Sequence, residues 1–285
     1  MRALWRRFEP VHAVVYFAPE GREQYGAAGL RGGWMAYFAS RSAPMGAVPA
    51  EVVTATFHVF HPAMVARAIP DAWRLSSPER VLEARRAVAG SALRRLLGDA
   101  ADSEVVVEAA SLARRAVEGC ALAGRPLHAA HAAQPWPEEP HVALWHACTL
   151  LREHRFDGHV AALLSEGLDG CAANVSLAAT GVVEAEQLRG FRGWSEDEWT
   201  AASEGLRERG WLDAEGALTP AGAAGRRRLE EATDRLATGP AEALGEAGCE
   251  RFDTLMTGLG ERILGGGGLP FPNPMGLAPA PAATR

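Results

Sequence analysis

The stretch LRERGWLDAEGALTPAGAAGRRRLEEATDRL, residues 206–236, carries the clearest fold signal in the sequence. Gly210 is the residue type that follows a helix C-terminus, and residues 211–218 have the pattern of a short β-hairpin. Thr219 and Pro220 form a helix start, with threonine as N-cap and proline at the first helical position. The stretch therefore predicts a helix end, a hairpin and a long helix in succession.

The residues just before this stretch predict two more helices. Residues 184–191 form a short helix, and Gly193 makes the turn after it. Ser195 and Glu198 then have the spacing of a capping box, in which each satisfies a backbone N–H of the other. The helix that they begin continues to Arg209. Residues 182–236 thus have the order of a winged helix-turn-helix.

Residues 206–236 resemble the MarR family of regulators, which join a winged helix to a helical dimerisation region and bind small ligands between the two. Two other segments, EPVHAVVYFAPE (residues 9–20) and LREHRFDGH (residues 151–159), are similar to a family of actinobacterial proteins classed as helix-turn-helix, the SCO-type hypothetical proteins. That likeness implies an α-helical fold and brings no known activity. All 29 basic residues are arginine, which is also typical of a GC-rich actinobacterial genome.

Helical periodicity dominates the rest of the chain, so the sequence predicts a mainly α fold with the wing as its one β-hairpin. We expect an N-terminal helical unit over residues 1–123, a Pro-rich linker over 124–140, a C-terminal helical unit over 141–264 and a disordered tail over 265–285. Ser77 and Pro78 start a helix that runs to Leu97. Its pattern places four arginines towards solvent: Arg85, Arg86, Arg94 and Arg95.

A faint internal repeat suggests that the two units are related. His12 and His146 each begin a similar order of motifs, including Gly-Leu-x-Gly at residues 29–32 and 167–170. Chance similarity in an Ala/Gly-rich chain is an equal alternative. If the repeat is real, the chain is a fused pseudo-dimer that can act as a monomer, and a true homodimer also remains open.

Charge argues against ordinary DNA binding. The helix from Ser195 to Arg209 carries five acids and two bases, and DNA phosphates repel acids. The formal net charge of −6 supplies no general basic surface. If DNA is bound, the arginines that would contact it are Arg189, Arg192, Arg226, Arg227 and Arg228.

The richest polar cluster is REHRFDGH, residues 152–159. Its side chains could clamp a ligand anion, do acid–base chemistry or simply end a helix in hydrogen bonds to the other unit. No standard metal motif is present, so we expect no metal site, and no cofactor is indicated. Together with an aromatic N-terminal half, the cluster predicts a ligand site at His12, Tyr16, His146, Arg152, His154, Arg155, Asp157 and His159.

Three functions fit these observations. The first is a small-molecule-binding protein on a winged-helix scaffold that has lost ordinary DNA binding, with its ligand in an interhelical cavity. The second is a MarR-like transcriptional regulator that binds DNA. The third is an enzyme of specialised metabolism that uses the His/Arg/Asp cluster in the same cavity. The sequence has no signal peptide and no long apolar run, so we expect a cytoplasmic protein with no membrane partner.

Overall fold

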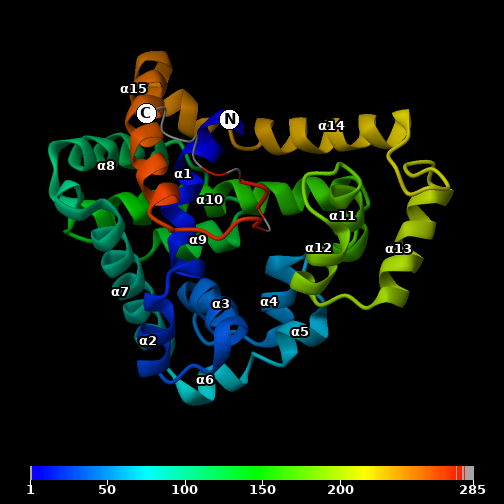
Figure 1. Cartoon of the computed structure of the whole chain (residues 1–285), viewed down its shortest axis with the longest axis horizontal. Helices are drawn as coiled ribbons and strands as arrows, with labels where there is room; N and C mark the ends of the chain where they lie inside the picture. Colours follow the sequence, from blue (N-terminus) through cyan, green and yellow to red (C-terminus); the bar gives the residue numbers. More distant parts are fainter. Residues whose placement is uncertain (1, 274, 278, 280–285) are drawn as a thin grey trace.

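The computed structural model describes residues 2–273, 275–277 and 279, and its regular elements are helices (Figure 1). The helices of the first part of the chain are α1 (Arg2–Phe17), α2 (Glu20–Ala27), α3 (Gly32–Ser42), η1 (Ala43–Met45), α4 (Ala50–Phe57), α5 (Pro62–Ala66), α6 (Asp71–Leu75), α7 (Pro78–Leu97), η2 (Gly98–Asp102), α8 (Glu104–Val117) and α9 (Pro126–Ala132). Those of the second part are α10 (Pro140–Ser165), α11 (Gly170–Ala178), α12 (Ala185–Arg192), α13 (Glu196–Glu208), α14 (Pro220–Arg235) and α15 (Gly239–Gly265). The predicted mainly α fold is confirmed.

Local side-chain caps set the helix starts that the sequence predicts. The hydroxyl of Ser77 accepts a hydrogen bond from the first turn of α7, and that of Thr219 does so at α14. At α13 the capping box is complete: the Glu198 amide donates to Ser195, and the Ser195 amide donates to the Glu198 carboxylate. These three helix starts follow from local sequence alone.

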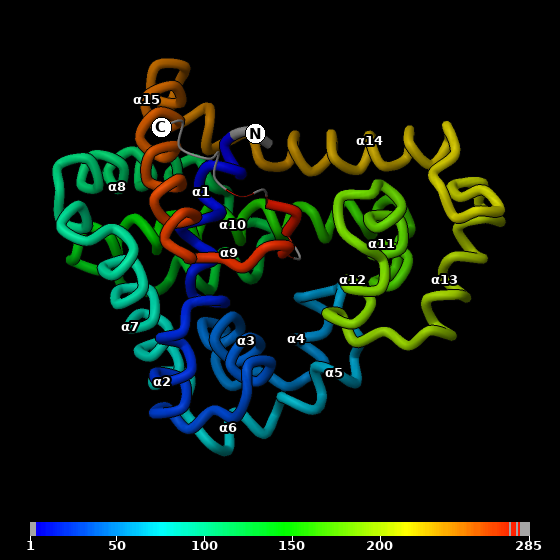
Figure 2. Tube along the Cα trace, viewed as in Figure 1, coloured from blue at the N-terminus to red at the C-terminus, as the bar shows by residue number. Residues whose placement is uncertain are grey.

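Helix α10 belongs to two hydrophobic cores and so connects the halves of the molecule (Figure 2). Its N-terminal part, with Leu144 and Leu151, packs among α1, α7 and α8 in the larger core. Its C-terminal end, with Leu163, lies in a smaller core formed with α11, α13 and α14. The smaller core is the interior of the helix-turn-helix region.

The helix-turn-helix consists of α12, a left-handed turn at Gly193 and α13, with α11 packed against both helices. The predicted β-hairpin wing is wrong, because the described residues contain no strand and only one antiparallel bridge, Leu212 to Leu218. The amide of Trp211 still bonds the end of α13, and Thr219 already caps α14. The arms between them therefore pair only briefly, through the Asp213 amide to the Ala217 carbonyl and the Thr219 amide to the Trp211 carbonyl, both at 3.0 Å.

A short segment between α4 and α5, residues 58–61, ties the N-terminal helices to the helix-turn-helix. The carbonyl of Val59 accepts hydrogen bonds from Asn174 at 2.8 Å and from the Trp194 indole at 3.0 Å. The His61 amide donates to the Arg192 carbonyl at 2.8 Å. The position of α12 is thus fixed by residues more than a hundred positions earlier in the chain.

Two segments expected to be irregular contain packed residues. The Pro-rich residues 124–140 include α9, which packs on α10 and buries Leu127. In the predicted tail, Leu269 is buried, and the Asn273 side chain bonds the carbonyls of Pro270 and Leu277. Residues 274, 278 and 280–285 of that tail lie outside the described residues. The internal repeat stays a prediction.

Candidate functional site

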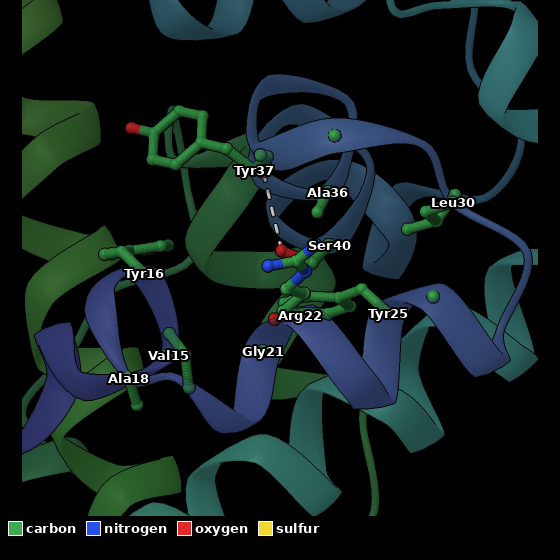
Figure 3. A pocket seen from close by; sticks show the side chains of 13 residues that line it. Val15, Tyr16, Ala18, Gly21, Arg22, Tyr25, Leu30, Ala36, Tyr37 and Ser40 are labelled. Carbon is green, nitrogen blue, oxygen red and sulfur yellow. Dashed lines mark hydrogen bonds between the residues drawn. The ribbon is translucent and has the colours of Figure 1, made fainter.

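A cavity of about 510 Å³ lies between α1, α2 and α3 (Figure 3). This volume falls in the range of small-molecule sites in proteins. Its wall mixes small and apolar residues with hydroxyl groups: Val15, Tyr16, Ala18, Gly21, Arg22, Tyr25, Gly26, Leu30, Gly32, Gly33, Ala36, Tyr37 and Ser40. Among these lining residues there is one charged side chain, that of Arg22, and no carboxylate.

All three tyrosines of the sequence line this cavity, one from each of its three helices. Burial raises the pKa of Tyr16 to about 12 and also raises that of Tyr25. These two hydroxyls therefore keep their protons at neutral pH, and the wall offers neutral hydrogen-bonding groups.

The hydroxyl of Tyr16 heads a buried hydrogen-bond relay whose direction can be assigned. Thr149 donates to the Trp145 carbonyl at 3.0 Å, so its oxygen accepts from Nδ1 of His12, also at 3.0 Å. Burial, together with Arg152, holds the pKa of His12 well below its usual value, so the ring is neutral. Its Nε2 therefore accepts a hydrogen bond from the Tyr16 hydroxyl at 3.0 Å. The relay leaves the Tyr16 hydroxyl oriented by the protein before any ligand arrives.

Arg85 of α7 lies behind the cavity wall and is 1% exposed. Its guanidinium reaches the hydroxyls of Ser40 and Tyr16, both at 3.4 Å. The predicted solvent position of Arg85 is wrong. Helical spacing puts it one turn from the buried residues Val81 and Ala89, so it lies on the core side of α7.

A buried ion cluster adjoins the same wall. The Glu153 carboxylate accepts two hydrogen bonds from Arg41, at 2.9 and 2.6 Å, and one from Arg152 at 3.3 Å. Arg152 also lies 3.7 Å from Glu9. Arg41 donates in turn to the Tyr37 hydroxyl at 2.9 Å, which connects the cluster to the cavity lining.

Burial and neighbouring charges shift the pKa values of the two carboxyls of the cluster in opposite directions. Burial alone would raise the pKa of Glu153, but Arg41 and Arg152 hold it well below its usual value. Burial raises the pKa of Glu9, and Arg152 only partly opposes this. Glu153 is therefore the firmly ionised acid of the cluster.

The end of α12 reaches towards this cluster. The Arg192 guanidinium lies over the Phe60 ring at 4.4 Å, and the exposed Trp34 of α3 contacts Phe191 at 6.4 Å between ring centroids. Burial lowers the pKa of Arg192, and Arg41 contributes through its charge. The first helix of the helix-turn-helix thus shares an aromatic and cationic contact with the cavity side of the molecule.

Of the predicted ligand residues, the structure brings together His12, Tyr16 and Arg152. His146 lies against the Trp136 ring on another side of α10. The remaining residues divide between two other faces of α10. His154 and Asp157 face His128 of α9, while Arg155 and His159 contact α14.

The arginines considered for DNA binding occupy different environments. Arg226 is buried and bonds Ser176, and Arg228 pairs with Glu166 at 3.2 Å. Arg192 lies over Phe60, as described above. Arg189 is half-buried and Arg227 is exposed. The exposed face of α13 carries Glu196, Asp197, Glu204 and Glu208 beside the single cation Arg207.

The sequence placed Tyr37 among the aromatic lining of the N-terminal half, but four residues at or behind the cavity were missed: Tyr25, Ser40, Arg41 and Arg85. One usable signal was the scarcity of tyrosine, since all three fall within the first 37 residues. For Arg85 the signal was its spacing from Val81. Nothing local marks Arg41, whose partner Glu153 lies 112 residues later.

Comparison with known proteins identifies the family. A model described as a helix-turn-helix family matches residues 1–270. The chain belongs to this helix-turn-helix family. No curated protein and no solved structure matches the chain. The described part of the chain holds no helix long and apolar enough to cross a membrane and no group of three or more side chains able to hold a metal ion.

Proposed function

We propose that this helix-turn-helix family protein binds a small molecule in the cavity between α1, α2 and α3, and that α13 has lost ordinary DNA reading. The observation that carries the proposal is the convergence of Tyr16, Tyr25 and Tyr37 on one cavity. Protonated hydroxyls in an otherwise small and apolar wall are the composition of a ligand site. The relay through His12 supports it further, because it orients the Tyr16 hydroxyl in advance.

The contact between α12 and α3 supports a link between the cavity and the helix-turn-helix. Trp34 is 40% exposed and belongs to the helix that supplies Tyr37 and Ser40. Its contact with Phe191 places α12 beside α3. A ligand that shifts α3 would therefore act directly on the position of α12.

Substitution of Gly33 tests the cavity. A Cβ at this position meets no atom within 4 Å, so Gly33→Trp can fill the cavity from the start of α3. Gly33→Ala is the matched control, because it makes the same backbone change with little added volume. A compound from a thermal-shift screen should raise the Tm of the wild type and of Gly33→Ala but leave Gly33→Trp unchanged.

Two results would contradict this proposal. One is a ligand that stabilises Gly33→Trp as well as it stabilises the wild type. The other is a screen without hits combined with native mass spectrometry that finds no co-purified molecule.

A DNA-binding regulator is the second candidate, favoured by the family itself. A gel shift with DNA from upstream of the protein's own coding region, at about 50 mM salt, tests it, because phosphate contacts strengthen steeply as salt falls. We expect no shift, since the exposed acids of α13 repel phosphates. A shift that Arg227→Gln weakens would favour the regulator over the proposal.

A further inference from the structure

The cavity has the opposite charge to the protein as a whole. The chain carries 35 acids and 29 arginines, yet the residues that line the cavity include Arg22 and no acid. Arg22 is exposed and forms no ion pair within the described part of the chain. In Figure 3 its side chain extends from α2 towards Ser40 on the opposite helix. The guanidinium of Arg22 is thus accessible at the cavity wall and is not tied up in an ion pair with any described residue.

A second cation lies behind the same wall without an acid partner. No carboxylate among the described residues lies within ion-pair distance of Arg85, and its Nε has no hydrogen-bond partner. Burying a charge without a counter-charge is costly. Beside it, the buried Tyr25 hydroxyl also has no partner in hydrogen-bond geometry, although Ser40 and Arg85 lie near enough to oppose the rise in its pKa.

In the neighbouring ion cluster, the carboxylates are already paired with arginines of the cluster itself. Glu153 is shared between Arg41 and Arg152. Burial raises the pKa of Glu9, and Arg152 opposes that rise. Beside the cavity wall, the guanidinium groups of Arg41, Arg85 and Arg152 therefore face the two carboxyls of Glu9 and Glu153. A bound anion would correct this imbalance.

We infer that the ligand of this cavity is a small organic anion, an inference that rests on the proposed function. Its carboxylate or phosphate group lies between Arg22 and the hydroxyls of Tyr25 and Ser40, with Arg85 behind them. Its apolar body lies against the remaining wall, which includes Val15, Ala18, Leu30 and Ala36. The ligand supplies the counter-charge that the protein itself lacks.

Matched pairs of probes test the charge of the ligand. Phenylacetate is compared with phenylacetamide, and octanoate with octanamide, by calorimetric titration of the full chain. Phenyl phosphate forms a separate arm that distinguishes a phosphate from a carboxylate. We expect each acid to bind about tenfold or more tightly than its amide, because a hydrogen bond to a charged group is worth more than one to a neutral group.

Three variants locate the charge. Arg22→Gln changes an exposed side chain and does not threaten the fold, whereas Arg85→Met removes the buried cation and is checked for folding by circular dichroism. Each should remove most of the preference for the acid over the amide. The control Arg6→Gln removes the same charge from an exposed position about 15 Å along α1 from Tyr16 and should leave the preference unchanged.

The outcomes separate this inference from the proposed function. If acids and amides bind equally, the anion inference is overturned while small-molecule binding in the cavity stands. If the preference for acids survives in both Arg22→Gln and Arg85→Met, the assigned position of the charge is overturned. If neither acids nor amides bind, the anion inference is overturned as well, and the Gly33 experiment then decides on the cavity.

Discussion

Acidification from pH 7 to pH 5 should destabilise this protein strongly, because the folded protein buries several histidines in their neutral form. Burial lowers the pKa of His131 and His154 to about 3 and that of His146 to about 4, and none of the three is more than 5% exposed. In the unfolded chain histidine titrates near about 6.5. Below that value the unfolded chain takes up protons that the folded chain does not. The contribution of these neutral histidines to the free energy of unfolding is therefore present in full above about pH 6.5. It is lost as the pH falls towards the pKa values of the folded protein.

The size of the loss follows from these pKa values. Each of the three histidines lowers the free energy of unfolding by about 0.7 kcal/mol between pH 7 and pH 6 and by about 1.8 kcal/mol between pH 7 and pH 5. Together they remove about 2 kcal/mol at pH 6 and about 5 kcal/mol at pH 5. Burial also lowers the pKa of His12, which adds to the loss. Ordinary proteins have only about 5–15 kcal/mol of stability, so little is left at pH 5.

Urea denaturation at pH 7, 6 and 5, followed by tryptophan fluorescence, measures this effect. His154→Leu is the informative variant, because neither ring nitrogen of His154 has a hydrogen-bond partner to lose. It should reduce the dependence of unfolding free energy on pH by about 1.4 kcal/mol per pH unit near pH 5. Arg6→Gln removes no histidine and should keep the wild-type slope. An unfolding free energy that is the same at pH 5 as at pH 7 would contradict the presence of buried neutral histidines.

Other predictions concern single contacts. Glu153→Gln leaves Arg41 without its buried counter-charge and should cost about 3–5 kcal/mol of unfolding free energy, measured by urea denaturation; a cost below about 1 kcal/mol would contradict the ion cluster. In Gly222→Ala the new Cβ overlaps the Trp211 carbonyl, so α14 must move away from Trp211, and the melting curve should show a loss of about 1–3 kcal/mol that Ala221→Ser does not. Ser195→Ala removes the cap of α13 and should cost about 1 kcal/mol in the same assay, whereas Ser195→Asp should retain most of the stability.

The helix-turn-helix was predictable because its signals are local. The capping box at Ser195, the left-handed turn at Gly193 and the Thr219–Pro220 start each act within a few residues. The acidity of α13 is likewise a property of the sequence and needs no tertiary contact. Residues 211–218 do not form the predicted hairpin because the end of α13 and the cap of α14 use most of the residues between them. Turn composition alone does not reveal this.

The candidate site was only partly predictable. His12, Tyr16 and Arg152 were expected and lie together, but the polar run after Arg152 spreads around α10. A helix turns by about 100° per residue, so consecutive polar residues face different partners. The run therefore contacts α9 and α14 as well as the ion cluster.

The helical character of the chain, the caps and order of its helix-turn-helix and the acidic surface of α13 are all encoded locally in the amino-acid sequence. The packing of the helices is what brings Tyr16, Tyr25 and Tyr37 to one cavity with Arg85 behind it. The reason is physical: these residues come from different helices, and helical periodicity shows which face is apolar without showing which helix covers it. The unbalanced charge of Arg85, on which the anion inference depends, exists only once α1, α2, α3 and α7 have packed together.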